Sequence, residues 1–357
     1  MSRNRRSPII LTLTVALVSV SVAIAGLLWW RARGERGGLT AVEIDRLAQS
    51  EAMIVRAIDA EFQRWEGIAS SGDELAGLPS DGTLLVFTPQ GIASVRGERL
   101  AYYPAVTPPE FPPDDRLIQA EQAENARRDL NAALALYRDA ASSTGRTVRA
   151  MATAGVGRCL RNLGRNTEAL AAYADLATMV EATVDGAPAP LVAHAEREAT
   201  FRSLGDAASA DLERRSIAEA LVARDRLIQK TAFDRFASAL RPGEFPAPAL
   251  ARAEAVTTMW LEWKGMPSGR AIAGAREGAS AAVWRRIGDQ SHALVAPVDV
   301  LMAPARDVAG RLNVAISVED AAGKTMWGTA PARTESITVP IPGTGESVKV
   351  RVALLRP

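Results

Sequence analysis

The feature that most limits how this chain can fold is an uncharged, apolar stretch near its N-terminus. Residues 8–30 are 23 positions without a charged side chain. As a helix rising about 1.5 Å per residue they would reach roughly 34 Å, enough to cross a hydrocarbon core of about 30 Å. Arginines flank both ends, and Trp29 and Trp30 occupy the place of an interfacial aromatic belt. The pattern predicts one transmembrane helix at 8–30, preceded by a cytoplasmic tail at 1–7.

A cleaved signal peptide is the competing interpretation, because Ala23 and Ala25 fit the small-x-small cleavage pattern. The apolar run continues beyond that site through residues 26–30 and exceeds a typical signal core of about 7–15 residues. We therefore expect an uncleaved signal-anchor. Basic residues and the free amine lead the chain, which favours an N-terminus inside and a C-terminal region outside the cytoplasm. The expected location is a bacterial inner membrane, crossed once.

The composition limits which kinds of partner the rest of the chain is expected to bind. With 42 basic and 41 acidic residues in 357, the sequence gives no sign of the basic surface that nucleic acid requires. The single cysteine, Cys159, cannot form an intramolecular disulfide, and we expect it to be a small buried apolar residue.

The segment 39–113 begins with an amphipathic helix. Five apolar residues recur at spacings of seven, four, four and three, which places them on one helical face: Leu47, Ile54, Ile58, Phe62 and Trp65. This stripe packs on the rest of the chain or, alternatively, on a second copy in a homodimer. Residues 84–87 and 92–95, joined by a turn with proline and glycine, predict a small β-hairpin. A proline-rich extended connector then ends at residue 113.

An internal repeat lies in the alanine- and leucine-rich region 114–240. The run 132–137 recurs 36 residues later as 168–173, a period typical of stacked helix pairs. Both runs end in a tyrosine, at Tyr137 and Tyr173. The sequence therefore predicts helical hairpins here.

This region resembles the tetratricopeptide repeat. The residues that carry the resemblance are Gly157, Leu163-Gly164, Ala169 and Tyr173, with Ala133, Tyr137 and Ala140 in the preceding unit. A following unit, with Leu204-Gly205 and Ala210, has Arg214 where the family has an aromatic residue. The resemblance implies helix pairs joined by Leu-Gly turns and a groove that binds a peptide. It makes Tyr137 and Tyr173 the candidate interaction residues, with core packing as the alternative.

The C-terminal third divides into two predicted parts. Residues 241–290 are expected to be helical, with Trp260, Trp263 and Trp284 either filling a core or facing a ligand. Residues 291–357 predict a small antiparallel sheet crossed by one helix. The fold class is thus mainly α with a smaller β part, comprising a transmembrane helix, tetratricopeptide-like hairpins and a C-terminal sheet.

We find no catalytic residues, metal ligands or cofactor-binding motif. Gly323-Lys324-Thr325 lacks the earlier glycine of a phosphate-binding loop, and Val318 stands in its place. The two histidines, His194 and His292, lie far apart in sequence, and only Glu198 shares a helix face with the first.

The order of parts resembles the extracytoplasmic input region of a bacterial membrane-bound sensor histidine kinase. The stretches that carry this resemblance are 81–87, 163–170 and 316–323. No phospho-acceptor histidine motif and no ATP lid follow them. The resemblance implies a non-catalytic sensory module that binds a protein or small ligand through its repeat-like helices. The alternative is a scaffold or assembly factor of a cell-envelope complex.

Overall fold

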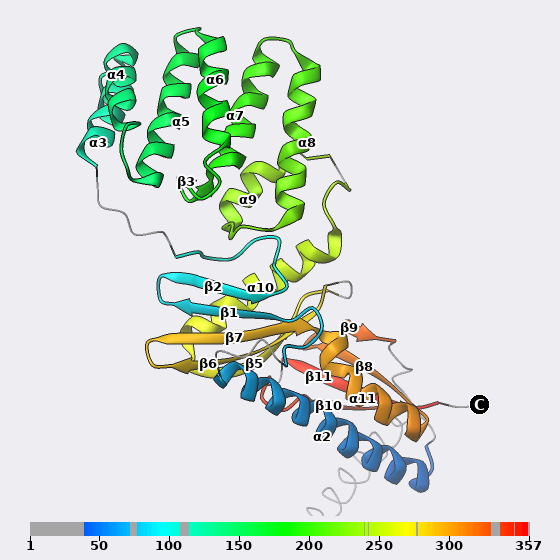
Figure 1. Cartoon of the computed structure of the whole chain (residues 1–357). Coiled ribbons are helices and arrows are strands. Elements are labelled where there is room, and N and C mark those ends of the chain that lie inside the picture. The colour runs from blue at the N-terminus through cyan, green and yellow to red at the C-terminus, as the bar shows by residue number, and fades with distance from the viewer. Residues whose placement is uncertain are drawn as a thin grey trace, which may run out of the picture. The chain divides into compact units, whose positions relative to one another are not determined.

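The computed structural model describes residues 39–71, 77–107, 114–238, 240–241, 243–275, 278–329, 336–345 and 347–355 (Figure 1). The chain divides into two compact units. One contains Met1–Glu61 with Met302–Pro357, and the other contains Phe62–Leu301.

The helix α2 (Ala41–Ser71) begins at a reciprocal cap, in which the Thr40 and Glu43 side chains bond each other's backbone N–H groups. The predicted apolar stripe lies on it as expected. Its five residues are fully buried within the single chain.

The membrane prediction needs correction. No helix in the described part of the chain is long and apolar enough to cross a membrane, which overturns the single-pass topology and inner-membrane location. The longest described helix, α2, carries acidic and basic side chains along its whole length. The predicted span 8–30 and the tail 1–7 lie outside the described residues.

Five antiparallel strands form the main sheet, in the order β2-β1-β7-β6-β5. The predicted hairpin is present as β1 (Thr83–Thr88) and β2 (Gly91–Gly97). The other three strands come from much later in the chain: β5 (Ser268–Ala273), β6 (Ser280–Ile287) and β7 (Gln290–Pro297). All the helices between 114 and 265 are therefore inserted between two halves of one sheet.

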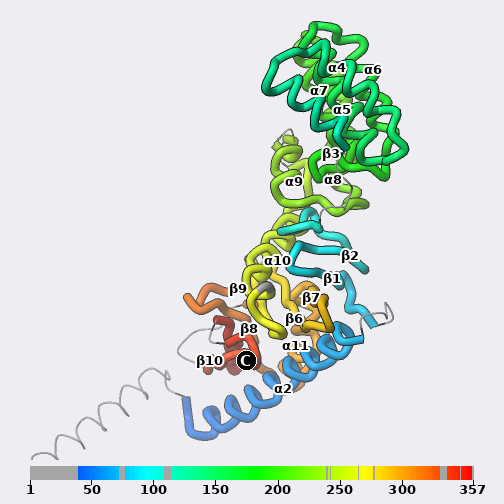
Figure 2. The backbone as a smooth tube through the Cα atoms, turned by 90° about the vertical axis from the view of Figure 1, so that its left-hand side faces the viewer, coloured from blue at the N-terminus to red at the C-terminus, as the bar shows by residue number. Residues whose placement is uncertain are grey.

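The helix α10 (Ala247–Gly265) packs along this sheet (Figure 2). Its close approach depends on residues without large side chains, since a Cβ on Gly278 would lie 2.1 Å from the Cβ of Ala251. The prediction of helix through residue 290 is wrong beyond Gly265. Alanine-rich β5 and β6 suggest helix by propensity, but tertiary packing under α10 selects strands.

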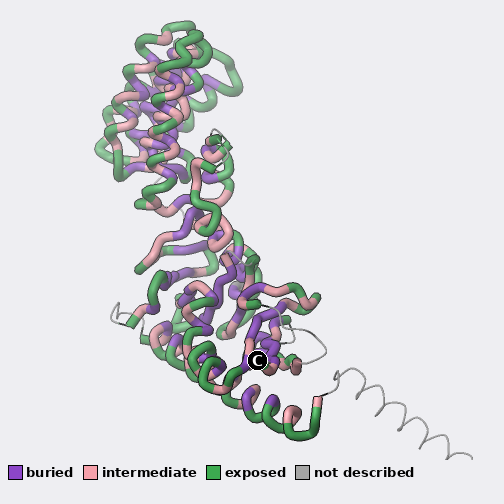
Figure 3. The backbone as a smooth tube through the Cα atoms, turned by 90° about the vertical axis from the view of Figure 1, so that its right-hand side faces the viewer, coloured by how far each residue is buried: buried purple, intermediate pink, exposed green. Residues whose placement is uncertain are grey.

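A stack of antiparallel helices occupies the region after the first hairpin (Figure 1). Each helix packs on the next, and Figure 3 shows the buried positions concentrated inside the stack. Its elements are α3 (Asp115–Glu121), the π-helix η1 (Gln122–Ala126), α4 (Leu130–Ala140), α5 (Arg146–Asn162), α6 (Asn166–Ala177), β3 (Thr183–Val184), β4 (Ala187–Pro188), α7 (Ala189–Ser203), α8 (Ala207–Ala223) and α9 (Lys230–Ala237).

Two Leu-Gly turns join helices in the stack. Gly164 after α5 and Gly205 after α7 both have φ +76°, a conformation that glycine adopts without a Cβ clash. In each turn the next N–H bonds a carbonyl of the preceding helix, as Arg165 does to Leu160 at 2.9 Å. The two Leu-Gly turns that the tetratricopeptide resemblance implies are therefore present.

The other unit contains a four-stranded antiparallel sheet in the order β10-β11-β8-β9. The strands are β8 (Val314–Asp320), β9 (Thr325–Gly328), β10 (Ser336–Pro340) and β11 (Val348–Leu354), and α11 (Val298–Leu312) precedes them. Together with the five-stranded sheet, these strands make the fold a mixture of helix and sheet. The predicted fold class, mainly α with a smaller β part, is therefore wrong.

Candidate functional site

The two tyrosines predicted as interaction residues lie inside the helix stack. Tyr137 on α4 is 2% exposed and Tyr173 on α6 is fully buried. Each ring lies against a glycine of α5, so that a Cβ on Gly155 or Gly157 would fall 2.6 Å or 2.4 Å from the ring. The glycines let the rings fill the space between neighbouring helices. Both tyrosines are packed between the helices of the stack.

The Tyr137 hydroxyl belongs to a buried polar cluster. It donates to Glu124 Oε2 at 2.8 Å, and Arg158 donates to both oxygens of the same carboxylate at 2.6 Å. Burial alone would raise the pKa of Glu124, but these donors hold it below its usual value. Burial and the bond to Glu124 raise the pKa of Tyr137. The cluster ties η1, α4 and α5 together.

We expect the stability from this cluster to depend on pH. Because the pKa of Glu124 is lowered by folding, its contribution is complete above the unfolded value of about 4.3 and is lost as the pH falls through the folded value. Glu124→Gln should therefore unfold at lower urea concentration than wild type at pH 7, and the two should converge towards pH 3. Exposed Glu121→Gln is the control and should follow wild type throughout. A difference in unfolding urea concentration between wild type and Glu124→Gln that stays constant with pH would contradict this account.

Other charged pairs run between the helices further along the stack. Arg161 on α5 donates to Glu196 on α7 at 2.5 Å, and Arg235 on α9 lies 3.5 Å from the same carboxylate. His194 Nδ1 lies 2.7 Å from Glu213 Oε2 on α8, whereas Glu198, its predicted neighbour on the helix face, pairs with Arg202. These contacts join helices and leave His194 without the ligand set of a metal site.

Few other groups in the described residues are candidates for metal binding, nucleophilic chemistry or phosphate binding. No group of three or more histidine, cysteine, aspartate or glutamate side chains there could hold a metal ion. Cys159 is buried, and burial raises the pKa of its thiol to about 11. Lys324 lies in the turn between β8 and β9, where its backbone N–H bonds Asp320 Oδ1 at 2.9 Å. This geometry is a hairpin turn and not a phosphate loop.

A cavity of about 280 Å³ lies at the foot of the stack, and we call it the foot pocket. Its walls come from the β3–β4 hairpin, the connector after α8 and the extended segment after β2. The lining residues are Val106, Thr107, Val180, Glu181, Ala182, Thr183, Gly186, Pro188, Arg226, Leu227 and Gln229.

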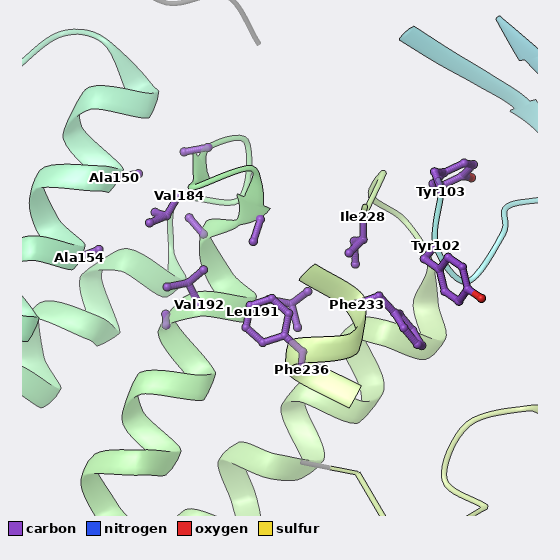
Figure 4. Close-up of a cluster of buried hydrophobic side chains, with 14 of the residues drawn as sticks. Tyr102, Tyr103, Ala150, Ala154, Val184, Leu191, Val192, Ile228, Phe233 and Phe236 are labelled. Carbon is purple, nitrogen blue, oxygen red and sulfur yellow. The ribbon is translucent and has the colours of Figure 1, made fainter. Parts of the chain in front are cut away.

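Backbone bonds hold the walls of the foot pocket in place. The Tyr103 N–H bonds Ile228 O at 2.8 Å and the Lys230 N–H bonds Tyr103 O at 2.9 Å, which joins the extended segment to the connector. Figure 4 shows the apolar side chains beside these segments, from Val184 and Leu191 to Ile228 and Phe236. The segments that form the pocket walls are therefore packed against buried apolar side chains.

Both polar and apolar groups face the foot pocket. Arg226 forms a bidentate ion pair with the Glu181 carboxylate at the rim, with N···O distances of 2.8 Å and 3.1 Å. Thr107 Oγ1 is buried and has no hydrogen-bond partner. Val180 also lines the pocket and has 52% of its surface exposed. The site can take an apolar group and offers hydrogen bonds around it.

Sequence reasoning did not find the foot pocket, because its walls are far apart in the chain. One local signal was present: Asp185-Gly186 is a favoured dipeptide for a two-residue hairpin turn, and both residues have positive φ, at 51° and 76°. That signal locates the β3–β4 hairpin but not its partners.

Known proteins offer no guide to this site. No protein-family model, curated protein or solved structure matches the chain.

Proposed function

We propose that this protein is a non-catalytic binding module whose helix stack is a tetratricopeptide-like array. Its foot pocket takes an apolar side chain from a segment of a partner protein. The observation that carries the proposal is the foot pocket itself, an apolar cavity with an exposed ion pair at its rim. The Leu-Gly turns and the tyrosines packed on glycines support the repeat-like part.

The surroundings of the foot pocket favour a peptide over a compact small molecule. Val180 is an exposed apolar side chain at the mouth, so a ligand that fills the cavity and also covers Val180 buries more apolar surface. The Glu181 and Arg226 side chains are 58% and 36% exposed, and ion pairs that water reaches in this way contribute little to stability. Either side chain can therefore exchange its partner for a charged group of a bound segment.

A displayed peptide library, selected on the full-length chain, tests the proposal. Peptides that bind wild type should lose about tenfold or more in affinity, about 1.4 kcal/mol, towards Val180→Asp. The loss is expected because the new carboxylate would have to lose water when the peptide covers it.

The matched control is Leu212→Asp, which replaces an apolar residue of α8 that is 58% exposed and lies outside the pocket. It should bind the selected peptides as wild type does. Failure to select any peptide, or peptides that bind Val180→Asp as well as wild type, would contradict the proposed function.

A further inference from the structure

A second cavity lies at one end of the five-stranded sheet, outside the helix stack. Three residues form a row across β1, β7 and β6, since Phe87 pairs with Ser291 and Ser291 pairs with Arg286. Directly paired residues point to the same face of a sheet. Trp284, two residues before Arg286 on β6, shares this face, which α10 covers. The row therefore lies under the C-terminal end of α10.

Trp263 from the last turns of α10 covers the row. Its ring stacks on Phe87 with centroids 5.9 Å apart and lies 6.1 Å from the ring of Trp284. Two hairpin turns form the mouth, one with Thr88 and Pro89 and the other with Gly288 and Asp289. Together these residues enclose about 280 Å³, which we call the tryptophan pocket.

Trp263, one of the residues that line the tryptophan pocket, carries a buried donor that the protein does not satisfy. Trp263 is 1% exposed, and its indole Nε1 has no hydrogen-bond partner. The neighbouring Trp284 Nε1 donates to the Met266 carbonyl at 3.2 Å. An unpaired buried N–H costs about 1–3 kcal/mol relative to a paired one. An acceptor in the pocket would recover that free energy.

A positive charge lines the same space. Arg286 is exposed, its backbone N–H bonds Pro267 O at 2.7 Å, and the residue is among those that line the pocket. Ser291 adds a hydroxyl from the row. Asp289 lies in the exposed turn at the mouth, where water and salt screen its charge. The buried donor and the cation thus both favour an anionic oxygen ligand, while Phe87, Pro89 and Trp263 favour a flat apolar body.

We propose that the tryptophan pocket binds a small aromatic carboxylate. One carboxylate oxygen accepts from Trp263 Nε1 and the other pairs with Arg286, while the ring packs on Phe87 and Pro89. A cavity of this size exceeds the engineered apolar cavity of about 150 Å³ that holds benzene, so it has room for a ring with a short acidic arm. The proposal is independent of the foot pocket and its peptide.

Phenylacetate is the probe, and uncharged phenylacetamide of the same shape is its comparison. Calorimetric titration of the full-length protein should show phenylacetate binding at least tenfold more tightly than the amide. The Trp263 indole N–H should shift downfield in a proton–nitrogen spectrum when phenylacetate is added, because it gains a charged acceptor. Trp263→Phe, which keeps an aromatic ring, and Arg286→Met, which keeps the apolar stem, should each weaken binding tenfold or more.

The control is Arg285→Met on the same strand. Arg285 lies on the other face of β6, where it bonds Ser70 Oγ at 3.3 Å and pairs with His292 in the sheet. This variant should bind phenylacetate as wild type does. No binding to wild type, equal affinity for acid and amide, or unchanged affinity in folded Arg286→Met would overturn the proposal. The indole shift in wild type gives an answer even where Trp263→Phe fails to fold.

Discussion

Gly157→Ala should lower the free energy of unfolding of the helix stack by about 2 kcal/mol, the usual range for overpacking being about 1–3 kcal/mol. The sign is informative, because replacing glycine with alanine inside a helix normally gains up to about 1 kcal/mol. Here the new Cβ would lie 2.4 Å from Cε1 of Tyr173, whose side chain is fully buried. Urea unfolding, with hydrogen exchange of the α5 and α6 amides, measures the loss.

Three further variants assign the cause. Gly67→Ala, at an exposed position of α2 with open space around it, should be stabilising. In a Tyr173→Leu background, Gly157→Ala should lower the free energy of unfolding much less, because the ring that the new Cβ would meet is gone. Tyr173→Phe should be nearly neutral, since the Tyr173 hydroxyl has no hydrogen-bond partner. An equal loss from Gly157→Ala with and without the ring would show that the clash is not its cause.

Arg351→Met should destabilise the four-stranded sheet by about 3 kcal/mol, because it leaves the Glu319 carboxylate buried without its partner. Arg351 on β11 donates to both oxygens of Glu319 on β8, at 2.7 Å and 2.5 Å. The two side chains are only 9% and 4% exposed. Urea unfolding of wild type and variant at pH 7 measures the difference.

The double variant Glu319→Leu/Arg351→Met separates burial from pairing. It should be more stable than Arg351→Met alone, because no charge is then left unpaired. The exposed pair Arg165–Glu168 has similar geometry, at 2.7 Å and 2.6 Å, so Glu168→Gln should have a much smaller effect. If Arg351→Met and Glu168→Gln lower the free energy of unfolding by equally small amounts, the buried pair is not important for stability.

Local patterns predicted several elements correctly. The apolar stripe from Leu47 to Trp65 has helical spacing, and the structure buries it on α2. The β1–β2 hairpin and the Leu-Gly turns follow from residues whose backbone preferences act over a few positions.

Predictions that needed long-range contacts did not succeed. Strands β5 and β6 contain Ala271, Ala281 and Ala282, which favour helix in isolation. They become strands because β7 pairs with β1, more than two hundred residues earlier, and α10 packs close over Gly278. Trp284 accordingly lies on a strand. The membrane prediction is a different case, because it rested on the local pattern of residues 8–30, which lie outside the described residues.

The candidate sites show the same division between what local patterns predict and what contacts between distant segments decide. From its repeat pattern, the sequence by itself determined that Tyr137 and Tyr173 occupy equivalent helix positions, because equal spacing along similar helices gives equal placement. Only the tertiary structure decided that both are core residues and that the foot pocket and the tryptophan pocket lie elsewhere. A cavity exists where segments distant in sequence meet without filling the space between them. Thr107, Glu181 and Arg226 meet in this way at the foot pocket, and Phe87, Trp263 and Arg286 at the tryptophan pocket.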